Sequence, residues 1–308
     1  MGQHTQPSSA PGAPAAAATG AFSYDQAFSR NIGWVTPAEQ AILRGKRVAI
    51  AGGGGVGGGH LLTLVRLGVA HFHIADFDDF DIVNFNRQVG ANVTTLGQPK
   101  VEVLAQMARD INPEVEIKLF PEGIDEHSLP AFLDGVDLYV DGLDFFAFKI
   151  RQQTFALCAR LGIPATTVAP LGMGAALLNF MPGKMTFEEY FQWGQCSDLE
   201  KAIRFVVGLA PAGLHRPYLV VPEAVNFAQQ RGPSTFMSCQ LCSAIAGTEA
   251  LKILLGRGDV LAAPHGMQFD AYRNKMVHTW RPGGNSHPLH KLAIMIGKRQ
   301  MAKAGVGQ

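Results

Sequence analysis

The hydrophobic positions of residues 46–182 follow two periods in alternation. Short apolar runs rich in Val, Ile and Leu are each followed by a longer stretch whose apolar residues recur at helical spacing. This order is typical of βαβ units, which build a parallel sheet. We therefore predict strands at 47–52, 71–77, 114–120, 136–144 and 163–170, with helices at 57–67, 99–111 and 146–161 between them.

The chain changes direction after the fifth predicted strand. Residues 174–183 are again strand-like, but only the tetrapeptide 171–174 joins them to that strand, which is too short for a helical crossover. The two strands are therefore expected to be antiparallel. A helix at 236–256 and a β-hairpin at 266–280, with its turn near Arg273–Asn274, follow. The predicted fold class is α/β: a Rossmann-like, mostly parallel sheet with helices on both faces, continued by an antiparallel portion and a C-terminal hairpin.

Composition and charge narrow the class of protein. The 308 residues are 47% hydrophobic, which suffices for a sizeable core. The formal net charge of +1 gives no general attraction for polyanions, so a nucleic-acid partner would require a local basic patch. No apolar run reaches membrane-spanning length, and the four cysteines fit a reducing cytoplasm better than a disulfide scaffold.

A glycine-rich loop follows the first predicted strand, where seven of the eight residues 52–59 are glycine. Gly52, Gly54 and Gly57 satisfy the G-x-G-x-x-G spacing, and Gly55 lies in the same loop. Glycine lets the chain turn sharply and brings peptide N–H groups and the positive end of a helix against a phosphate. The loop therefore indicates a nucleotide site; the alternative is a tight turn without a ligand.

Acidic residues end the second predicted strand. Asp76 comes 19 residues after Gly57, where a carboxylate accepts hydrogen bonds from both hydroxyls of a ribose, and Asp78 follows it. The loop and Asp76 together predict an adenine nucleotide with a free ribose. Both NAD and ATP meet that description.

Three polar residues beyond this strand, Asn84, Arg87 and Lys100, favour ATP. A dehydrogenase needs no cations at this place. Cleavage of the bond between the α- and β-phosphates does, because it builds negative charge that Arg and Lys neutralise. The alternative is that Arg87 and Lys100 are ordinary solvated cations.

Two aspartates stand at the end of the fourth predicted strand, where the carboxyl ends of parallel strands open onto a ligand crevice. Asp144 lies just beyond the strand and is a candidate ligand for the Mg²⁺ that accompanies ATP. Asp141 is less well placed and can cap a turn instead. Either aspartate can also serve as a helix N-cap.

Taken together, these segments resemble the ThiF/MoeB/ubiquitin-activating-enzyme family of adenylating enzymes. The resemblance covers about residues 27–182, with a weaker echo at 236–256, and is carried by SRNIGWVTPAEQAIL, AGGGGVGG, DFDDFDIVNFNRQ, GQPKVE, INPEVEI and DGLDFFAFK. It implies a homodimer that binds ATP and Mg²⁺ and adenylates a carboxylate. In the family this is commonly the C-terminal glycine of a ubiquitin-like or sulfur-carrier protein.

The resemblance also implies a role for each candidate residue. Asp76 would bind the ribose. Asn84 and Arg87 would contact the phosphates, Lys100 would lie on the β- and γ-phosphates, and Asp144 would hold Mg²⁺. The chemistry agrees, because a carboxylate attacks the α-phosphorus and pyrophosphate departs, so positioning and charge neutralisation suffice without a protein nucleophile.

Arg30 takes its role from the resemblance alone. It matches the family arginine that reaches into the active site of the partner subunit. Considered by itself, it is a cation close to the N-terminal tail. The resemblance therefore implies that the dimer is part of the catalytic machinery.

The cysteines depart from the family pattern. Many members hold zinc with two C-x-x-C pairs, whereas here only Cys239 and Cys242 have that spacing, and both fall inside a predicted apolar helix. We therefore expect buried thiols and no zinc. Cys196 is the candidate for a thioester, but Asp198 and Glu200 beside it do not lower its pKa, so a bystander thiol is the preferred interpretation.

We divide the chain into four parts. Residues 1–21, rich in Ala, Pro, Gly and Ser, are predicted to be a disordered tail, and residues 22–183 to be the nucleotide-binding adenylation domain. Residues 184–235 are an irregular segment of the same domain, where we place substrate selection. Residues 236–308 hold a helix, the hairpin and a basic tail, which we expect to pack by its apolar side rather than to bind an acidic partner or a membrane surface.

Four functions compete, of which we prefer a cytoplasmic adenylyltransferase acting on a protein or peptide carboxylate. The NFNRQ string also resembles the tRNA threonylcarbamoyladenosine dehydratase branch, against which the low net charge and the long segment 184–234 argue. The cationic set argues against a non-catalytic nucleotide-binding scaffold. An NAD-dependent oxidoreductase would leave Arg87, Lys100 and Asp144 without a role.

Overall fold

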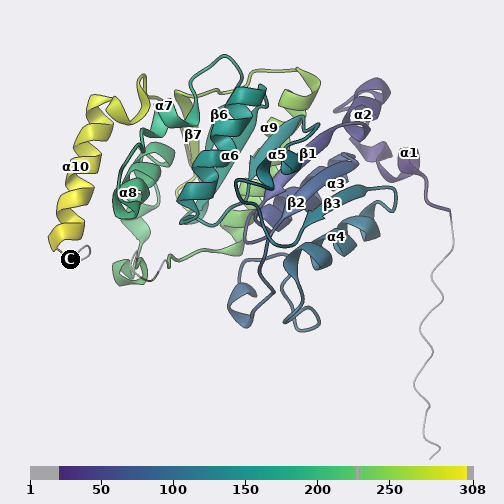
Figure 1. Cartoon of the computed structure of the whole chain (residues 1–308), viewed down its shortest axis with the longest axis horizontal. Coiled ribbons are helices and arrows are strands. Elements are labelled where there is room, and N and C mark those ends of the chain that lie inside the picture. Colours follow the sequence, from purple (N-terminus) through teal and green to yellow (C-terminus); the bar gives the residue numbers. More distant parts are fainter. Residues whose placement is uncertain (1–20, 227–228, 230, 304–308) are drawn as a thin grey trace, which may run out of the picture.

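An eight-stranded sheet forms the centre of the molecule (Figure 1). The computed structural model describes residues 21–226, 229 and 231–303, so the predicted tail lies outside them except for its last residue. The strand order is β3-β2-β1-β4-β5-β6-β7-β8. The strands are β1 (Arg47–Ala51), β2 (His71–Ala75), β3 (Glu116–Phe120), β4 (Leu138–Asp141), β5 (Ala165–Leu171), β6 (Gly174–Phe180), β7 (His265–Asp270) and β8 (Lys275–Trp280).

The sheet has a parallel half and an antiparallel half, as predicted. All pairs from β3 to β5 are parallel, and all pairs from β5 to β8 are antiparallel. The reversal occurs at the short turn between β5 and β6, where Leu171 pairs with Gly174. In the hairpin turn between β7 and β8, Asn274 has a φ of 49°, a conformation that asparagine tolerates.

Helices cover both faces of the sheet. On β1, Val48 and Ile50 point to one face and Ala49 and Ala51 to the other, because side chains alternate along a strand. The first face packs against α3 (Gly57–Leu67), α4 (Lys100–Ile111) and α9 (Phe236–Leu255). The second packs against α5 (Leu129–Phe132), α6 (Phe148–Leu161), α7 (Phe187–Phe191) and α8 (Asp198–Leu209). The prediction of helices on both faces is confirmed.

A short N-terminal segment lies at the C-terminal end of α3. It comprises α1 (Tyr24–Ala27), η1 (Ser29–Asn31) and α2 (Pro37–Arg44). The Tyr24 hydroxyl donates to the Gly68 carbonyl at 2.6 Å, and the Gln40 amide donates to the Leu67 carbonyl at 2.9 Å. These contacts fasten the segment that carries Arg30 to the end of α3 that is remote from the glycine-rich loop.

The segment 184–235 contains more regular structure than predicted. Besides α7 and α8 it holds η3 (Arg216–Tyr218) and η4 (Pro222–Ala224). The 12-residue α8 begins where Ser197 accepts a hydrogen bond from the Glu200 N–H at 3.3 Å. Phe205 of α8 packs against the rings of Phe191 and Trp193. Burial of this apolar side stabilises a helix whose charged first turn resembles a loop in the sequence.

The C-terminal helix α10 (Pro288–Lys303) packs on α8. Ile294 is buried, and Gly297 lies against Ile203. Lys298 forms an ion pair with Glu200 at 2.6 Å. The helix therefore packs on α8 through only part of its apolar residues, while Leu289, Leu292, Met295 and Ile296 are exposed. Throughout residues 21–226, 229 and 231–303, no helix has both the length and the apolar character needed to cross a membrane.

Candidate nucleotide site

Three parallel strands end at the same level beside the glycine-rich loop. Ala51 of β1 is in register with Ala75 of β2 and with Asp141 of β4. The Gly52 N–H donates to the Ala75 carbonyl at 2.7 Å, and the Gly142 N–H donates to the Ala51 carbonyl at 2.9 Å. The residues after these strands therefore meet at the carboxyl ends of the parallel strands, which is where open α/β sheets bind ligands.

Contacts within the protein require glycine at two positions of the G-x-G-x-x-G string. Gly52 has a φ of 90°, and a Cβ atom there would overlap the Gly142 carbonyl. A Cβ atom at Gly57 would overlap the Gly52 carbonyl. The close approach of these three backbones lets β1 turn directly into α3.

Gly54 and Gly55 are less restricted. The nearest atom to a Cβ built at Gly54 is the Gln88 side-chain nitrogen at 3.7 Å, an ordinary contact distance. A Cβ at Gly55 would lie 3.1 Å from the Cys239 sulfur and 3.8 Å from Cγ of Arg87. The glycine cluster thus serves close packing at Gly52 and Gly57, while Gly54 keeps space beside its backbone.

The loop leads into the N-terminus of α3, which begins at Gly57 without a side-chain cap. The N–H groups of a first helical turn have no partners within the helix, and the helix dipole places partial positive charge there. With 11 residues, α3 is long enough for its peptide dipoles to add up along the helix axis. The end of α3 is therefore suited to an anion such as a phosphate.

Asp76 lies directly after β2 and contacts the glycine-rich loop. Its Oδ2 accepts a hydrogen bond from the Gly53 N–H at 2.6 Å, and its Oδ1 accepts one from the Asp78 N–H at 2.8 Å. Each carboxylate oxygen has a further lone pair for a ligand hydroxyl. Asp76 is thus held against the loop, with capacity on both oxygens to accept a further hydrogen bond.

Lys100 is the first residue of α4 and is directed by Asp78. Its ammonium lies 2.8 Å from Oδ2 of Asp78, and the Lys100 N–H donates to the Asp78 carbonyl at 3.0 Å. The Lys100 side chain is 6% exposed, so it is not the solvated cation of the alternative interpretation. The structure places Asp78 as the partner of Lys100.

Asn84 and Arg87 lie around η2 (Ile82–Asn84), next to the glycine-rich loop. Asn84 is buried, and its side-chain oxygen accepts a hydrogen bond from the Asp81 N–H at 2.9 Å. The Arg87 guanidinium donates to the Val83 carbonyl at 2.8 Å and to the Asn86 side-chain oxygen at 3.1 Å. The alkyl part of Arg87 faces Gly55, so this arginine belongs to the wall of the loop.

Asp141 is an internal ion-pair partner. Its Oδ2 lies 2.8 Å from Nε of Arg151 in α6, and both side chains are 2% exposed. The Thr167 hydroxyl also donates to Oδ2, at 3.0 Å, and the Leu143 N–H donates to Oδ1 at 3.3 Å. Asp141 therefore does more than cap a turn.

Asp144 is the exposed aspartate of this strand end. Its Oδ1 accepts a hydrogen bond from the Phe146 N–H at 2.9 Å. A carboxylate in this position can bind a cation, and Mg²⁺ needs only one or two protein carboxylates when phosphates supply the other ligands. Among the residues that the structure describes, no group of three or more His, Cys, Asp and Glu side chains could hold a metal ion by itself.

The structure does not place Arg30 beside these residues within one chain. Arg30 is exposed in η1, next to Asn31, whose amide donates to the Leu67 carbonyl at 3.3 Å at the end of α3. An 11-residue α-helix is about 16 Å long, and the glycine-rich loop lies at its other end. By contrast, Asp76 and Arg87 both lie against the loop.

The cysteines are free thiols in the described chain. Cys239 and Cys242 are buried in α9, and burial raises the pKa of both. Cys196 is half-buried beside α8, where burial and a hydrogen bond with Glu200 raise its pKa. Its nearest charged groups include Lys298 of α10, so Cys196 lies by the C-terminal helix.

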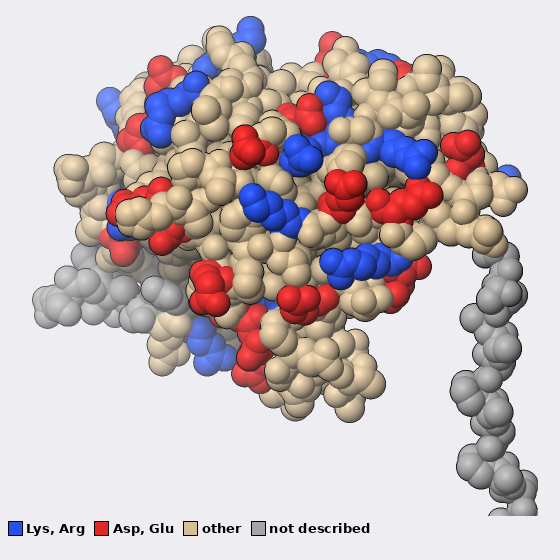
Figure 2. Space-filling view, turned by 45° about the vertical axis from the view of Figure 1, so that its right-hand side comes forward, with Lys and Arg blue, Asp and Glu red and all other residues tan. Residues whose placement is uncertain are grey.

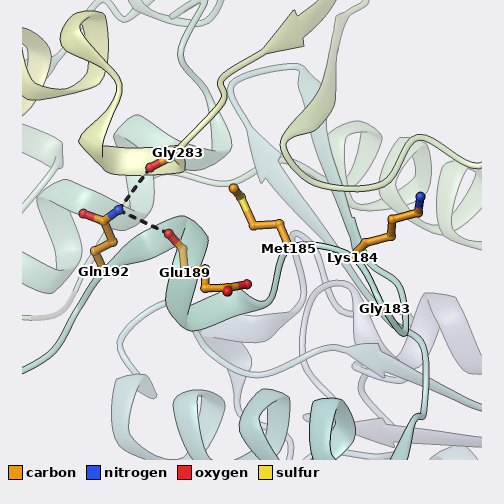
Figure 3. Close-up of a pocket in the computed structure, with 6 residues that line it drawn as sticks. All are labelled: Gly183, Lys184, Met185, Glu189, Gln192 and Gly283. Carbon is orange, nitrogen blue, oxygen red and sulfur yellow. Dashed lines mark hydrogen bonds between the residues drawn. The ribbon is translucent and has the colours of Figure 1, made fainter.

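An open surface hollow of about 490 Å³ lies at the opposite edge of the sheet (Figure 3). Its lining includes Lys184 after β6 and Gly283 after β8. Both strands run antiparallel to β5, so they end on the side of the sheet that lies away from the glycine-rich loop. Gln192 donates to the carbonyls of Glu189 and Gly283, while Lys184 points away from them (Figure 3). The Gln192 amide is therefore bonded to backbone carbonyls of the hollow itself, and the Glu189 carboxylate is bonded to Thr186.

Sequence reasoning missed three residues at the site. Arg151 was part of a predicted helix without a role, Gln88 has a buried and unpartnered side-chain oxygen near Gly54, and Cys239 lies beneath the loop. Only Gln88 carried a signal, as the last residue of the NFNRQ string. The contacts of Arg151 and Cys239 arise between segments far apart in the sequence.

The chain is similar in sequence to enzymes of two kinds. The chain is 36% identical to tRNA threonylcarbamoyladenosine dehydratase of Bacillus subtilis over 150 residues, covering 48% of the chain and 57% of that protein. It is 32% identical to molybdopterin-synthase adenylyltransferase of Escherichia coli over 141 residues, covering 46% of the chain and 56% of that protein. The chain thus spans little more than half the length of these relatives.

Solved structures share the fold. The crystal structure of E. coli MccB with ATP superimposes with a TM-score of 0.63 at 18% identity, covering 87% of this chain and 75% of that one. PaaA superimposes with a TM-score of 0.63 at 15% identity, covering 83% and 73%. The sequence profile of the ThiF family matches residues 28–291, which includes the glycine-rich loop, every strand and the start of α10. The chain belongs to the ThiF family.

Proposed function

We propose that the chain is a cytoplasmic, ATP-dependent adenylyltransferase that activates the carboxylate of a protein or peptide and releases pyrophosphate. The observation that carries this proposal is a buried lysine, Lys100, paired with Asp78 two residues after Asp76, together with Arg87, whose alkyl part faces Gly55 of the loop. A bound dinucleotide needs no buried lysine there, whereas a triphosphate does. Relatives named as adenylyltransferases for molybdopterin synthase and for the sulfur carrier ThiS support it.

The chemistry is a displacement at the α-phosphorus of ATP. A carboxylate oxygen forms a bond to that phosphorus as the bond to the bridging oxygen of the β-phosphate breaks, and pyrophosphate leaves with the electron pair. Negative charge then grows on oxygens that face the α3 N-terminus, Arg87 and Lys100. Asp76 orients the nucleotide through its ribose. No residue of the chain needs to form a covalent intermediate.

Asp144 is the residue that we propose to hold Mg²⁺. Its carboxylate is exposed at the carboxyl end of β4, and the structure gives it one hydrogen bond, to the Phe146 N–H. The ion would supply charge neutralisation for the phosphates. The buried pair Asp141–Arg151 cannot take this role without losing its internal bonds.

We further propose a homodimer in which Arg30 reaches the site of the partner subunit. Within one chain Arg30 lies at the end of α3 remote from the loop, so contact with a phosphate requires a second copy. Exposed apolar residues support an interface: Trp34 follows Arg30 closely in the sequence, whereas Phe77 directly follows Asp76 near the glycine-rich loop. Trp34, Phe77 and Val93 are 84%, 76% and 83% exposed. Burial of side chains of this size stabilises association.

A second candidate is a tRNA-modifying dehydratase, favoured by the 36% identity to the Bacillus subtilis enzyme. Duplex and loop RNA are bound largely through clusters of Lys and Arg. On the face that Figure 2 shows, basic and acidic side chains are interspersed over the surface. We therefore prefer a protein or peptide carboxylate, which MccB structures with MccA illustrate for a related fold.

Exchange of labelled pyrophosphate into ATP tests the function. We expect exchange that depends on Mg²⁺ and on a peptide with a free C-terminal carboxylate, and none with the amidated form of the same peptide. Release of AMP that depends on tRNA, without exchange on any peptide, would favour the dehydratase. Reduction of NAD by the protein would contradict both.

A further inference from the structure

We propose that Arg151 is a positioning residue that shapes the loop carrying Asp144 and thereby sets how strongly Mg²⁺ promotes nucleotide binding. This inference rests on the proposed function, because it takes Asp144 as the metal-binding carboxylate. It adds a residue that is buried in the core and would act on the metal only through the backbone of the loop.

The Arg151 guanidinium is the centre around which the loop curls. Its Nε donates to Oδ2 of Asp141 at 2.8 Å. Its Nη2 donates to the carbonyls of Leu143 at 2.8 Å and Asp144 at 2.9 Å. Its Nη1 donates to the carbonyl of Phe145 at 3.2 Å. Three consecutive carbonyls therefore point at one cation, which defines the path of the backbone.

This geometry determines where the Asp144 side chain points. Because the carbonyl of Asp144 faces inward to Arg151, its side chain lies on the exposed side of the loop. The hydrogen bond from the Phe146 N–H to Oδ1 then limits rotation of the carboxylate. A preorganised carboxylate loses less freedom on binding a cation than a mobile one.

Lysine cannot replace Arg151 in this role. The five N–H donors of arginine form a planar fork. The four hydrogen bonds described above use all three nitrogens of that fork. Lysine presents a compact ammonium at the end of a flexible chain, so it can neutralise Asp141 but cannot hold three carbonyls in place. The Arg151→Lys substitution thus separates charge from positioning.

The same guanidinium connects the loop to the segment 184–235. Its Cζ lies 4.9 Å from the ring centroid of Phe205, which belongs to α8. Phe205 also packs against Phe145 of the loop, with ring centroids 5.4 Å apart. The loop is therefore held from the core side by Arg151 and from the side by an aromatic residue of α8.

Nucleotide affinity measured with and without metal tests the inference. The dissociation constant of a fluorescent, non-hydrolysable ATP analogue is determined by titration of the full chain in saturating Mg²⁺ and in EDTA. We expect wild-type protein to bind about ten-fold tighter with Mg²⁺, and Arg151→Lys to lose most of that gain while its affinity in EDTA changes by less than about two-fold. Because Asp144→Asn removes the same effect, the double variant should lose no more than either single one.

The controls separate positioning from general damage. Arg160→Lys changes an exposed arginine of the same helix and should leave the Mg²⁺ effect at the wild-type value. If Arg151→Lys fails to fold, Phe205→Leu removes the ring beside the guanidinium without leaving a charge unpaired, and should lose part of the Mg²⁺ effect. An unchanged effect in a folded Arg151 or Phe205 variant overturns the inference alone. Wild-type protein that binds no nucleotide overturns the proposed function and the inference with it.

Discussion

The Lys100 ammonium lies 2.8 Å from the Asp78 carboxylate, at the boundary between core and solvent. The lysine side chain is 6% exposed and the aspartate side chain 54% exposed. Burial of a charged group is costly unless the group is paired, and the Asp78 carboxylate is the partner of Lys100. Asp78 therefore keeps a cation ready beside the glycine-rich loop, where a phosphate can share it.

The Lys100→Ala substitution should impair catalysis far more than stability. Loss of one transition-state cation costs about 2–4 kcal/mol, or roughly a 30- to 1,000-fold fall in the rate of pyrophosphate exchange. Lys201→Ala is the matched control, because Lys201 also pairs with an exposed aspartate, Asp198, at 3.4 Å. Exchange at the wild-type rate in Lys100→Ala would remove the role of this lysine.

Two alanine substitutions in the glycine-rich loop should affect different quantities, one the stability of the fold and the other the affinity for nucleotide. Gly57→Ala places a Cβ on the Gly52 carbonyl, and overpacking of this kind destabilises by about 1–3 kcal/mol. Gly54→Ala meets nothing closer than 3.7 Å, so the free energy of unfolding should stay near the wild-type value while nucleotide affinity falls. Urea unfolding and nucleotide titration measure the two quantities. Equal destabilisation by both substitutions would contradict the division of roles.

Mixed subunits test the shared site. Arg30→Ala and Arg87→Ala homodimers should both lack exchange activity. In an equimolar mixture, half of the dimers carry one intact site, so activity should return to about a quarter of the wild-type value. A mixture that stays as inactive as its components would contradict a contribution of Arg30 across the interface.

The stability of the fold should fall in acid partly because of His60. Its side chain is fully buried in α3 with both ring nitrogens unpartnered, and burial lowers its pKa to about 3. Between pH 6.5 and 3 the unfolded chain binds a proton on His60 that the folded chain does not. The free energy of unfolding then falls as pH falls, by up to about 1.4 kcal/mol per pH unit from this group.

Urea unfolding between pH 7 and 4.5 measures this dependence. His60→Leu should flatten the slope below pH 6.5 relative to wild type. His127→Leu serves as the control, because His127 is an exposed histidine outside the core. Identical slopes for His60→Leu and wild-type protein would show that His60 does not contribute.

The sequence predicts the fold well because the fold is encoded in local periodicity. Every strand from β1 to β8 and the helices α3, α4, α6 and α9 fall where apolar patterns predicted them, within a few residues. The short helices α2, α5 and α7 were not predicted, and neither was the longer α8. Its first turn carries Asp198 and Glu200, and its apolar side becomes recognisable only through the aromatic residues of α7 that cover it.

The site is predictable only where a residue's role follows from its place next to a strand. Asp76 and Asp144 follow β2 and β4, so their convergence at one edge could be anticipated. The partnership of Arg151 with Asp141 could not, because a polar residue early in a helix ordinarily faces solvent. The remoteness of Arg30 from its own loop likewise required knowledge of how η1 packs on α3.

A crystal structure of the protein with Mg²⁺ and a non-hydrolysable ATP analogue tests the central claim most directly. We expect the phosphates at the N-terminus of α3, the ribose hydroxyls on Asp76, Lys100 and Arg87 within hydrogen-bonding distance of phosphate oxygens, and the ion on Asp144. A nucleotide bound elsewhere, with Lys100 still paired only to Asp78 and Arg87 turned to solvent, would contradict the proposed adenylation site.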